Sequence, residues 1–162
     1  MLKLDYPEAD YKKYDSDCPF TFEINKITEI EKPKGQLQYC GMNLSYPKLK
    51  GKIHLTYLGV DEKLLKISLR DAQNLTQEHT QKAESIKPIA YENENQNAYG
   101  MVYEVEGDAA SPVQFYITDN EKHFLRGAVY FNAKPNYDSI LPAAHYIKKD
   151  IEMLMESLHW KN

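Results

Sequence analysis

Residues 98–132, "AYGMVYEVEGDAASPVQFYITDNEKHFLRGAVYFN", contain the pattern that decides the fold. Three segments rich in β-branched and aromatic residues, 98–107, 111–119 and 122–132, are separated by short polar stretches. Such side chains favour strands, and short connections join antiparallel neighbours. The tight turn "DNEK" at 119–122 joins the last two segments. The stretch therefore predicts three consecutive strands of an antiparallel sheet.

The chain before this stretch carries further strand signals of the same kind. In the most regular of them Ile53 and Leu55 face one way, whereas His54 and Thr56 face the other. Strands are predicted in this way at 18–24, 39–46, 51–58 and 86–92. Pro88 confines the last of these to a sheet edge or to its own start.

Two helices interrupt and follow the strands. The apolar period changes to 3.6 over 61–83, and a second helix begins at Asp138 or Ser139 as N-cap. We expect an α+β fold, in which a mostly antiparallel sheet is covered by these two main helices. A polar, extended N-terminal arm is predicted over 1–17, and a single domain over 18–162.

Both helices have one apolar and one polar face. The stripe of the first contains Leu65, Leu69, Ala72, His79 and Ala83. The apolar face of the second contains Ile140, Leu141, Ala144, Ile147, Ile151, Leu154 and Leu158, and its polar face is expected to contain Lys148, Lys149, Asp150 and Glu152. Each helix should pack its apolar face against the sheet.

Composition narrows the function classes. The 162 residues carry a formal net charge of −4, which argues against a nucleic-acid-binding protein, because such a protein needs a basic surface. No apolar run approaches the roughly 18 residues that a membrane span requires. The start, "MLKLDYPEAD", lacks the apolar region of a signal peptide. Tyrosine is frequent, at 13 residues against five phenylalanines.

The chain has two cysteines, Cys18 and Cys40. They form no CxxC motif, and the five histidines show no metal-ligand spacing, so no metal site is predicted. Cys18 follows "DSD", and this negative charge opposes a reactive thiolate. Both cysteines begin strand-like segments, so the residues alone leave two possibilities, a pair of buried thiols or one disulfide.

A nucleophilic triad of Ser111, His123 and Asp119 is conceivable, but the chain has no GxSxG motif. Asp119 and His123 flank a hairpin turn, where capping explains such residues. Arg126 shares a strand face with Tyr130, so a helix packed there would bury its charge. A buried guanidinium needs a carboxylate or carbonyl groups as partners. Asp108 and Asp119 are the candidates, and an ion pair that fixes the strand is the favoured interpretation.

His79 lies on the apolar stripe of the first helix near Lys82, and a core histidine bonded to a backbone carbonyl is the simplest interpretation. We predict no catalytic residues and no cofactor. The candidate functional cluster comprises His79, Lys82, Ser111, His123 and Arg126.

Several stretches in order along the chain resemble the gliding-motility lipoprotein GldD family of Bacteroidetes. The most distinctive are "DSDCPFTFEI" at 15–24 and "KHFLRGAVYF" at 122–131, and the likeness extends from about residue 11 to residue 160. The resemblance implies an exported envelope lipoprotein that faces the periplasm and serves gliding and the linked type IX secretion machinery. It brings no enzymatic activity. Membrane association is expected only through a lipid anchor that is absent from this chain.

The resemblance also decides between the cysteine alternatives. Export to an oxidising periplasm implies a Cys18–Cys40 disulfide. The strand–helix order looks like the Mog1/PsbP α/β/α sandwich, which is an analogy at the level of the fold. We expect envelope proteins of the gliding or secretion machinery as partners, and no nucleic acid. The expected contact surfaces are the loop 107–111 and the arm, with its tyrosines Tyr6, Tyr11 and Tyr14.

Two alternatives come from other classes of protein. One is an enzyme that acts on a small molecule or peptide through Ser111, His123 and Arg126. The other is a ligand-binding sensor. An enzyme would need these three side chains around one solvent-reaching pocket.

Overall fold

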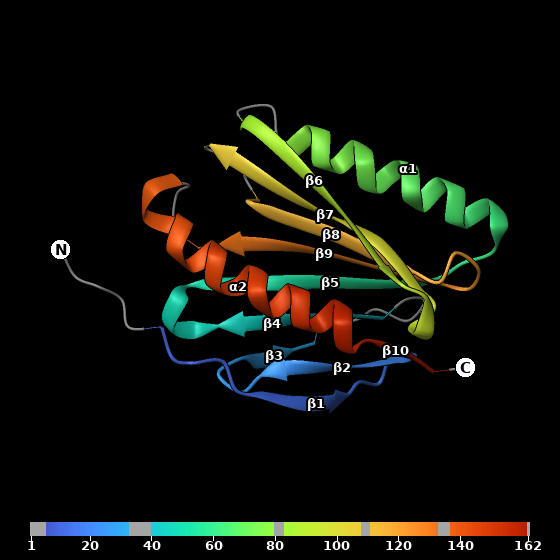
Figure 1. Ribbon diagram of the computed structural model, residues 1–162, viewed down its shortest axis with the longest axis horizontal. Coiled ribbons are helices and arrows are strands. Elements are labelled where there is room, and N and C mark those ends of the chain that lie inside the picture. Colours follow the sequence, from blue (N-terminus) through green and yellow to red (C-terminus); the bar gives the residue numbers. More distant parts are fainter. Residues whose placement is uncertain (1–5, 33–39, 80–82, 108–110, 133–136, 162) are drawn as a thin grey trace.

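The computed structural model describes residues 6–32, 40–79, 83–107, 111–132 and 137–161. Within them it contains two antiparallel sheets and two α-helices (Figure 1). The strands are β1 (Tyr11–Asp15), β2 (Phe20–Asn25), β3 (Glu29–Glu31), β4 (Cys40–Tyr46), β5 (Gly51–Gly59), β6 (Ala83–Asn93), β7 (Ala98–Gly107), β8 (Val113–Thr118), β9 (His123–Phe131) and β10 (His159–Trp160). The helices are α1 (Glu62–His79) and α2 (Tyr137–Ser157), with short 3-10 turns at Pro47–Leu49 and Glu94–Gln96.

The larger sheet has seven strands in the order β3-β4-β5-β9-β8-β7-β6, and the smaller has three in the order β1-β2-β10. Every described pairing is antiparallel. The centre of the large sheet pairs β5 with β9, so residues 51–59 lie beside residues 123–131. The strand order thus joins distant parts of the sequence.

Helix α2 crosses one face of the large sheet (Figure 1) and forms the main core with it. The small sheet adds its apolar face to the same core. The largest fully enclosed side chains include Tyr46, Phe20, Phe22, Phe115, Ile53, Leu55, Ile117, Leu125, Ile147 and Ile151. Leu158, which follows α2, is also buried.

Helix α1 covers the opposite face of the large sheet, and it covers this face only in part. Among its side chains that the structure describes, Ser68 and Ala72 are buried. Strand residues under and beside the helix, among them Tyr103 and Tyr116, remain half-buried. This uneven covering leaves polar and aromatic side chains within reach of solvent on the α1 side.

The strands predicted from alternation are present. Strand β7 has the predicted bounds, and β5 buries Ile53 and Leu55 while His54 points to the other face. Strand β6 is an edge strand, as Pro88 requires. The α+β class with two main helices is therefore confirmed.

Three expectations need correction. Helix α1 ends at His79, and Ala83, expected on its stripe, begins β6. Residues 11–15 of the predicted arm form β1, which pairs with β2. Asp150, expected on the polar face of α2, is only 5% exposed. The small sheet covers part of α2, and helical periodicity alone did not reveal that second covering surface.

The structure contains the Cys18–Cys40 disulfide, with a Cα–Cα distance of 5.6 Å. Cys18 precedes β2 of the small sheet and Cys40 begins β4 of the large one. The bond therefore ties the two sheets together. Because both cysteines are paired, neither is a free thiol.

Gly127 allows the Phe115 ring to pack closely against the backbone of β9. A Cβ atom at this position would lie 2.2 Å from Cε1 of Phe115, whose ring is buried and cannot move aside. We expect Gly127→Ala to lower the free energy of unfolding by roughly 1–3 kcal/mol through overpacking. Gly59→Ala is the matched control, since a Cβ there meets only the Tyr57 hydroxyl at 3.9 Å. Equal urea-unfolding midpoints for the two variants would contradict this account.

Candidate functional site

Ser111 is fully buried, and its hydroxyl is used by the fold. The Oγ atom lies 3.0 Å from the carbonyl oxygen of Val113 and 2.7 Å from that of Val129. These contacts fasten the start of β8 to β9. The single hydroxyl proton is directed at these carbonyl oxygens, and the hydrogen bonds of Ser111 among the described residues include no imidazole or carboxylate that could activate it as a nucleophile.

His123 lies at the other end of β9. Its Nδ1 atom is 2.6 Å from the Tyr57 hydroxyl, and its ring stacks on Trp160 with centroids 4.8 Å apart. Burial lowers the pKa of this imidazole, and the negative charge of Asp119 opposes that shift. The side chain is thus held within an aromatic cluster.

Asp119 has the capping role that its place in the turn predicted. Its Oδ1 atom accepts hydrogen bonds from the backbone N–H groups of Glu121, Lys122 and His123. The Ser111 contact with Val129 lies six positions along β9 from His123, about 20 Å in an extended strand. The conceivable triad is therefore not assembled.

Two further members of the candidate cluster cannot be placed from the part of the chain that the structure describes. His79 is the last residue of α1, and its side chain is outside the described part of the structure. Lys82 lies outside the described residues, as does Asp108, one of the two carboxylates proposed for Arg126.

Arg126 points to the α1 side of the large sheet and is half-buried. Burial lowers the pKa of its guanidinium, and the nearby Asp71 of α1 raises it. Asp71, rather than Asp119, is thus the acidic residue that influences Arg126. Among the described residues, no carboxylate oxygen forms an ion pair within 4.0 Å of the guanidinium. The expected strand-fixing ion pair is therefore not found in this part of the chain.

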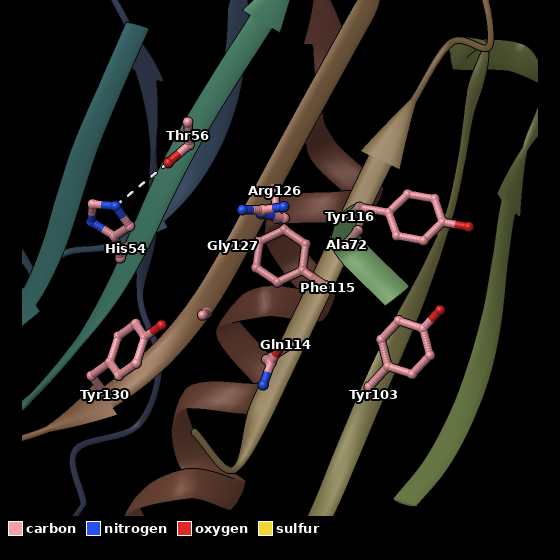
Figure 2. Close-up of a pocket in the computed structure, with 11 residues that line it drawn as sticks. His54, Thr56, Ala72, Tyr103, Gln114, Phe115, Tyr116, Arg126, Gly127 and Tyr130 are labelled. Carbon is pink, nitrogen blue, oxygen red and sulfur yellow. Dashed lines mark hydrogen bonds between the residues drawn. The ribbon is translucent and has the colours of Figure 1, made fainter. Parts of the chain in front are cut away.

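Arg126 lies in a cavity of about 110 Å³, which we call the Arg126 pocket (Figure 2). Four neighbouring strands build it, β5, β9, β8 and β7. Its polar lining consists of His54, Thr56, Tyr103, Gln114, Tyr116, Arg126 and Tyr130, and Ala72 of α1 contributes the helix side. In Figure 2 Tyr103 and Tyr116 lie on one side of Arg126, and His54 and Tyr130 on the other.

Among the described lining residues of the pocket, Arg126 is the one with a permanent charge, and Asp71 of α1 lies near enough to act on it. Partial loss of water lowers the pKa of His54, and the charges of Lys52 and Arg126 lower it further. The His54 Nδ1 atom lies 2.6 Å from Asn43 Oδ1, so a neutral ring with its proton on Nδ1 fits this contact. Burial raises the pKa of the Tyr103 and Tyr116 hydroxyls, which therefore stay neutral near pH 7. The pocket suits hydrogen bonding and the binding of a small anionic group.

The sequence predicted the orientation of several lining residues but not the pocket. Alternation predicted that His54 and Thr56 share one face of their strand, and that Arg126 and Tyr130 share one face of theirs. Nothing local indicated that β9 would lie between β5 and β8 and bring these faces together. The available signal was a run of polar or aromatic residues at alternate positions in two of the strands, Lys52, His54 and Thr56 in β5 and Gln114, Tyr116 and Thr118 in β8.

The tyrosines of the N-terminal segment pack against the fold. The Tyr6 ring stacks on Tyr146 at 5.2 Å, and Tyr14 meets Phe22 edge to face. The Tyr11 hydroxyl donates to Asp150. Residues 108–110 of the other expected contact surface lie outside the described residues.

Fold and site together define an α+β domain with a polar, tyrosine- and arginine-lined surface pocket. Within the described residues the hydroxyl–imidazole contact of this pocket is Thr56 Oγ1 to His54 Nε2 at 3.5 Å, which is longer than the roughly 2.6–3.2 Å expected of a nucleophile activated by a base. No group of three or more histidine, cysteine, aspartate or glutamate side chains in the described part of the chain is placed to bind a metal.

The chain can also be assigned to a particular protein family. The model described as "Gliding motility lipoprotein GldD" matches residues 1–160, and the chain belongs to this family. The resemblance inferred from the sequence motifs is thereby confirmed. No curated protein matches the chain.

No helix in the described parts of the chain combines the length and the apolarity that crossing a membrane requires.

Proposed function

We propose that this chain is the non-catalytic domain of an envelope lipoprotein, and that it binds a protein partner of the gliding and linked type IX secretion machinery. Family membership supports the setting. The binding role is supported by the α1-side face, by which we mean the face of the large sheet on which α1 lies. On this face the half-buried tyrosines Tyr103, Tyr116 and Tyr130 lie around Arg126. Tyrosine and arginine are among the residues most enriched at the energetic centres of protein interfaces.

A periplasm-facing, lipid-anchored location is part of this proposal. It accords with the disulfide, because disulfides persist in oxidising compartments. The Mog1/PsbP-like sandwich and the division into an arm and a domain stay predictions. Because the arm tyrosines are engaged by the fold, we favour the α1-side face over the arm as the contact surface.

The alternatives have less support. The enzyme alternative needs Ser111 and His123 at one pocket with Arg126. Ser111 contacts Val129 near the end of β9, whereas His123 is the first residue of that strand. The sensor alternative needs a cavity for a ligand. The Arg126 pocket, at about 110 Å³, is smaller than the roughly 300–1,000 Å³ of typical small-molecule sites. A second hollow of about 560 Å³, lined in part by Leu69, Tyr99 and Tyr116, has the size for a ligand, but its described lining contains no basic side chain.

Complementation of a gliding bacterium that lacks its own family member tests the proposal. The domain is expressed behind the host protein's lipoprotein leader, and colony spreading is measured. We expect Ser111→Ala to spread like wild type, and Arg126→Gln to lose most spreading while its melting temperature stays unchanged. Arg70→Gln is the matched control, since Arg70 is an exposed arginine on α1.

The opposite pattern would contradict the proposal. If Ser111→Ala or His123→Gln abolished spreading with the fold intact, whereas Arg126→Gln did not, a catalytic role would be favoured.

A further inference from the structure

Arg126 carries a charge that its described surroundings only partly balance. The guanidinium is half-buried, and removing such a charge from water is unfavourable unless an anion or acceptors compensate. Asp71 acts on it electrostatically, yet none of the ion pairs within 4.0 Å among the described residues joins Asp71 to Arg126. Thr56, whose hydroxyl lies 3.5 Å from His54 Nε2, is a neighbouring side chain that can also donate to an incoming acceptor. In Figure 2 the hydroxyls of Tyr103 and Tyr116 point away from Arg126, so these residues offer the faces and edges of their rings.

The size and the rim of the pocket limit what could enter. About 110 Å³ holds several waters or one small polar group, and it does not enclose a metabolite. Half-buried rings of Tyr103, Tyr116 and Tyr130 line the pocket. These rings offer an amphipathic surface to a larger molecule that remains outside the pocket while one of its groups enters the pocket.

The charge count favours a monoanion. Among the described lining residues, Arg126 is the permanent cation, since His54 has a lowered pKa. One guanidinium matches one carboxylate in fork geometry. A phosphate dianion would bring more negative charge than this lining balances, and Asp71 would repel a dianion more strongly than a carboxylate with a single charge.

We propose that the Arg126 pocket receives the side-chain carboxylate of an aspartate or glutamate presented by a protein partner. The carboxylate pairs with Arg126, and the surrounding tyrosines pack against the partner's backbone. This inference rests on the proposed function, and it names the chemistry by which the α1-side face recognises its partner.

The chain itself provides a clean measurement, because it has two arginines, Arg70 and Arg126. Labelling with ¹⁵N-arginine gives two side-chain Nε–H signals, and the exposed Arg70 is an internal control. The protein is titrated at constant ionic strength with acetyl-Ala-Glu-Ala-amide, with its glutamine analogue and with inorganic phosphate. The Arg126→Gln variant identifies which signal belongs to Arg126.

We expect the glutamate peptide to shift the Arg126 signal saturably, and the glutamine peptide to bind at least about fivefold more weakly. Arg70 should not move. The inference is overturned if both arginine signals move together, if the two peptides act alike, or if phosphate binds as tightly as the glutamate peptide. A loss of spreading in Arg126→Gln without a peptide-induced shift would overturn the carboxylate inference alone and leave the proposed function standing.

Discussion

Replacing Asp150 with alanine should lower the free energy of unfolding by about 3–5 kcal/mol. The carboxylate is only 5% exposed and accepts three hydrogen bonds. The Tyr11 hydroxyl donates to Oδ1 at 2.6 Å, the Tyr46 hydroxyl to Oδ2 at 2.6 Å, and Asn25 Nδ2 to Oδ2 at 3.1 Å. Each buried donor left without an acceptor costs about 1–3 kcal/mol.

Urea unfolding followed by circular dichroism measures this loss. Glu156→Ala is the matched control, because Glu156 lies on the exposed side of the same helix. Tyr46→Phe, which removes one donor but keeps the ring, should cost about 1 kcal/mol and remain well folded. If Asp150→Ala cost no more than Glu156→Ala, the buried carboxylate would not hold these elements together.

The three donors explain why the effect should be large. Tyr11 belongs to β1, Asn25 to β2 and Tyr46 to β4, whereas Asp150 belongs to α2. Burial and the Asp150 charge raise the pKa of both tyrosine hydroxyls, so both remain donors over the ordinary pH range. A single side chain thus links both sheets to the helix between Tyr137 and Ser157.

Asp150 also shows what sequence patterns can reveal and what they cannot. Period-2 and period-3.6 signals are local, and they located the longer strands and both helices. They identify a helix residue as exposed when it lies opposite the apolar stripe. Helix α2 is covered on a second side by β2, and a polar residue there is buried because its hydrogen bonds are satisfied.

The short strands were missed for a related reason. Strand β3 has three residues and β10 has two, which is too short for an alternation to be recognised. Strand β1 is largely polar, with Lys12 and Lys13 exposed, and it pairs with β2 through its backbone. Backbone pairing leaves little trace in the sequence when one face of a strand is solvated.

The Arg126 pocket could not be predicted from local patterns either, because it depends on the order of the strands in the sheet. The sequence showed that Arg126 and Tyr130 share a face, and the structure agrees. It could not show that Tyr103 of β7 and His54 of β5 would flank them, because strand order is set by tertiary pairing. The geometry gives the catalytic alternative little support for the converse reason. Ser111 precedes β8 and contacts Val129 near the end of β9, whereas His123 begins β9, although the two residues are only 12 positions apart in the sequence.

Reducing the Cys18–Cys40 disulfide should lower the free energy of unfolding by about 3 kcal/mol. The bond closes a loop between residues 22 positions apart, and it joins the segment before β2 to the first residue of β4. Cutting it gives the unfolded chain more freedom and leaves the two sheets held by non-covalent contacts alone. Urea unfolding with and without dithiothreitol measures the difference.

The double variant Cys18→Ser/Cys40→Ser separates the bond from side effects of the reductant. It should be as unstable as the reduced wild type and should not respond to dithiothreitol. A wild-type protein whose unfolding midpoint is unchanged by reduction would contradict the prediction. Non-reducing mass mapping of protein taken from the native envelope extends the test to the cell, where an oxidised pair is expected because an exported domain folds in an oxidising compartment. Free thiols there would oppose the proposed location, because the 5.6 Å Cα separation allows the bond wherever an oxidant is present.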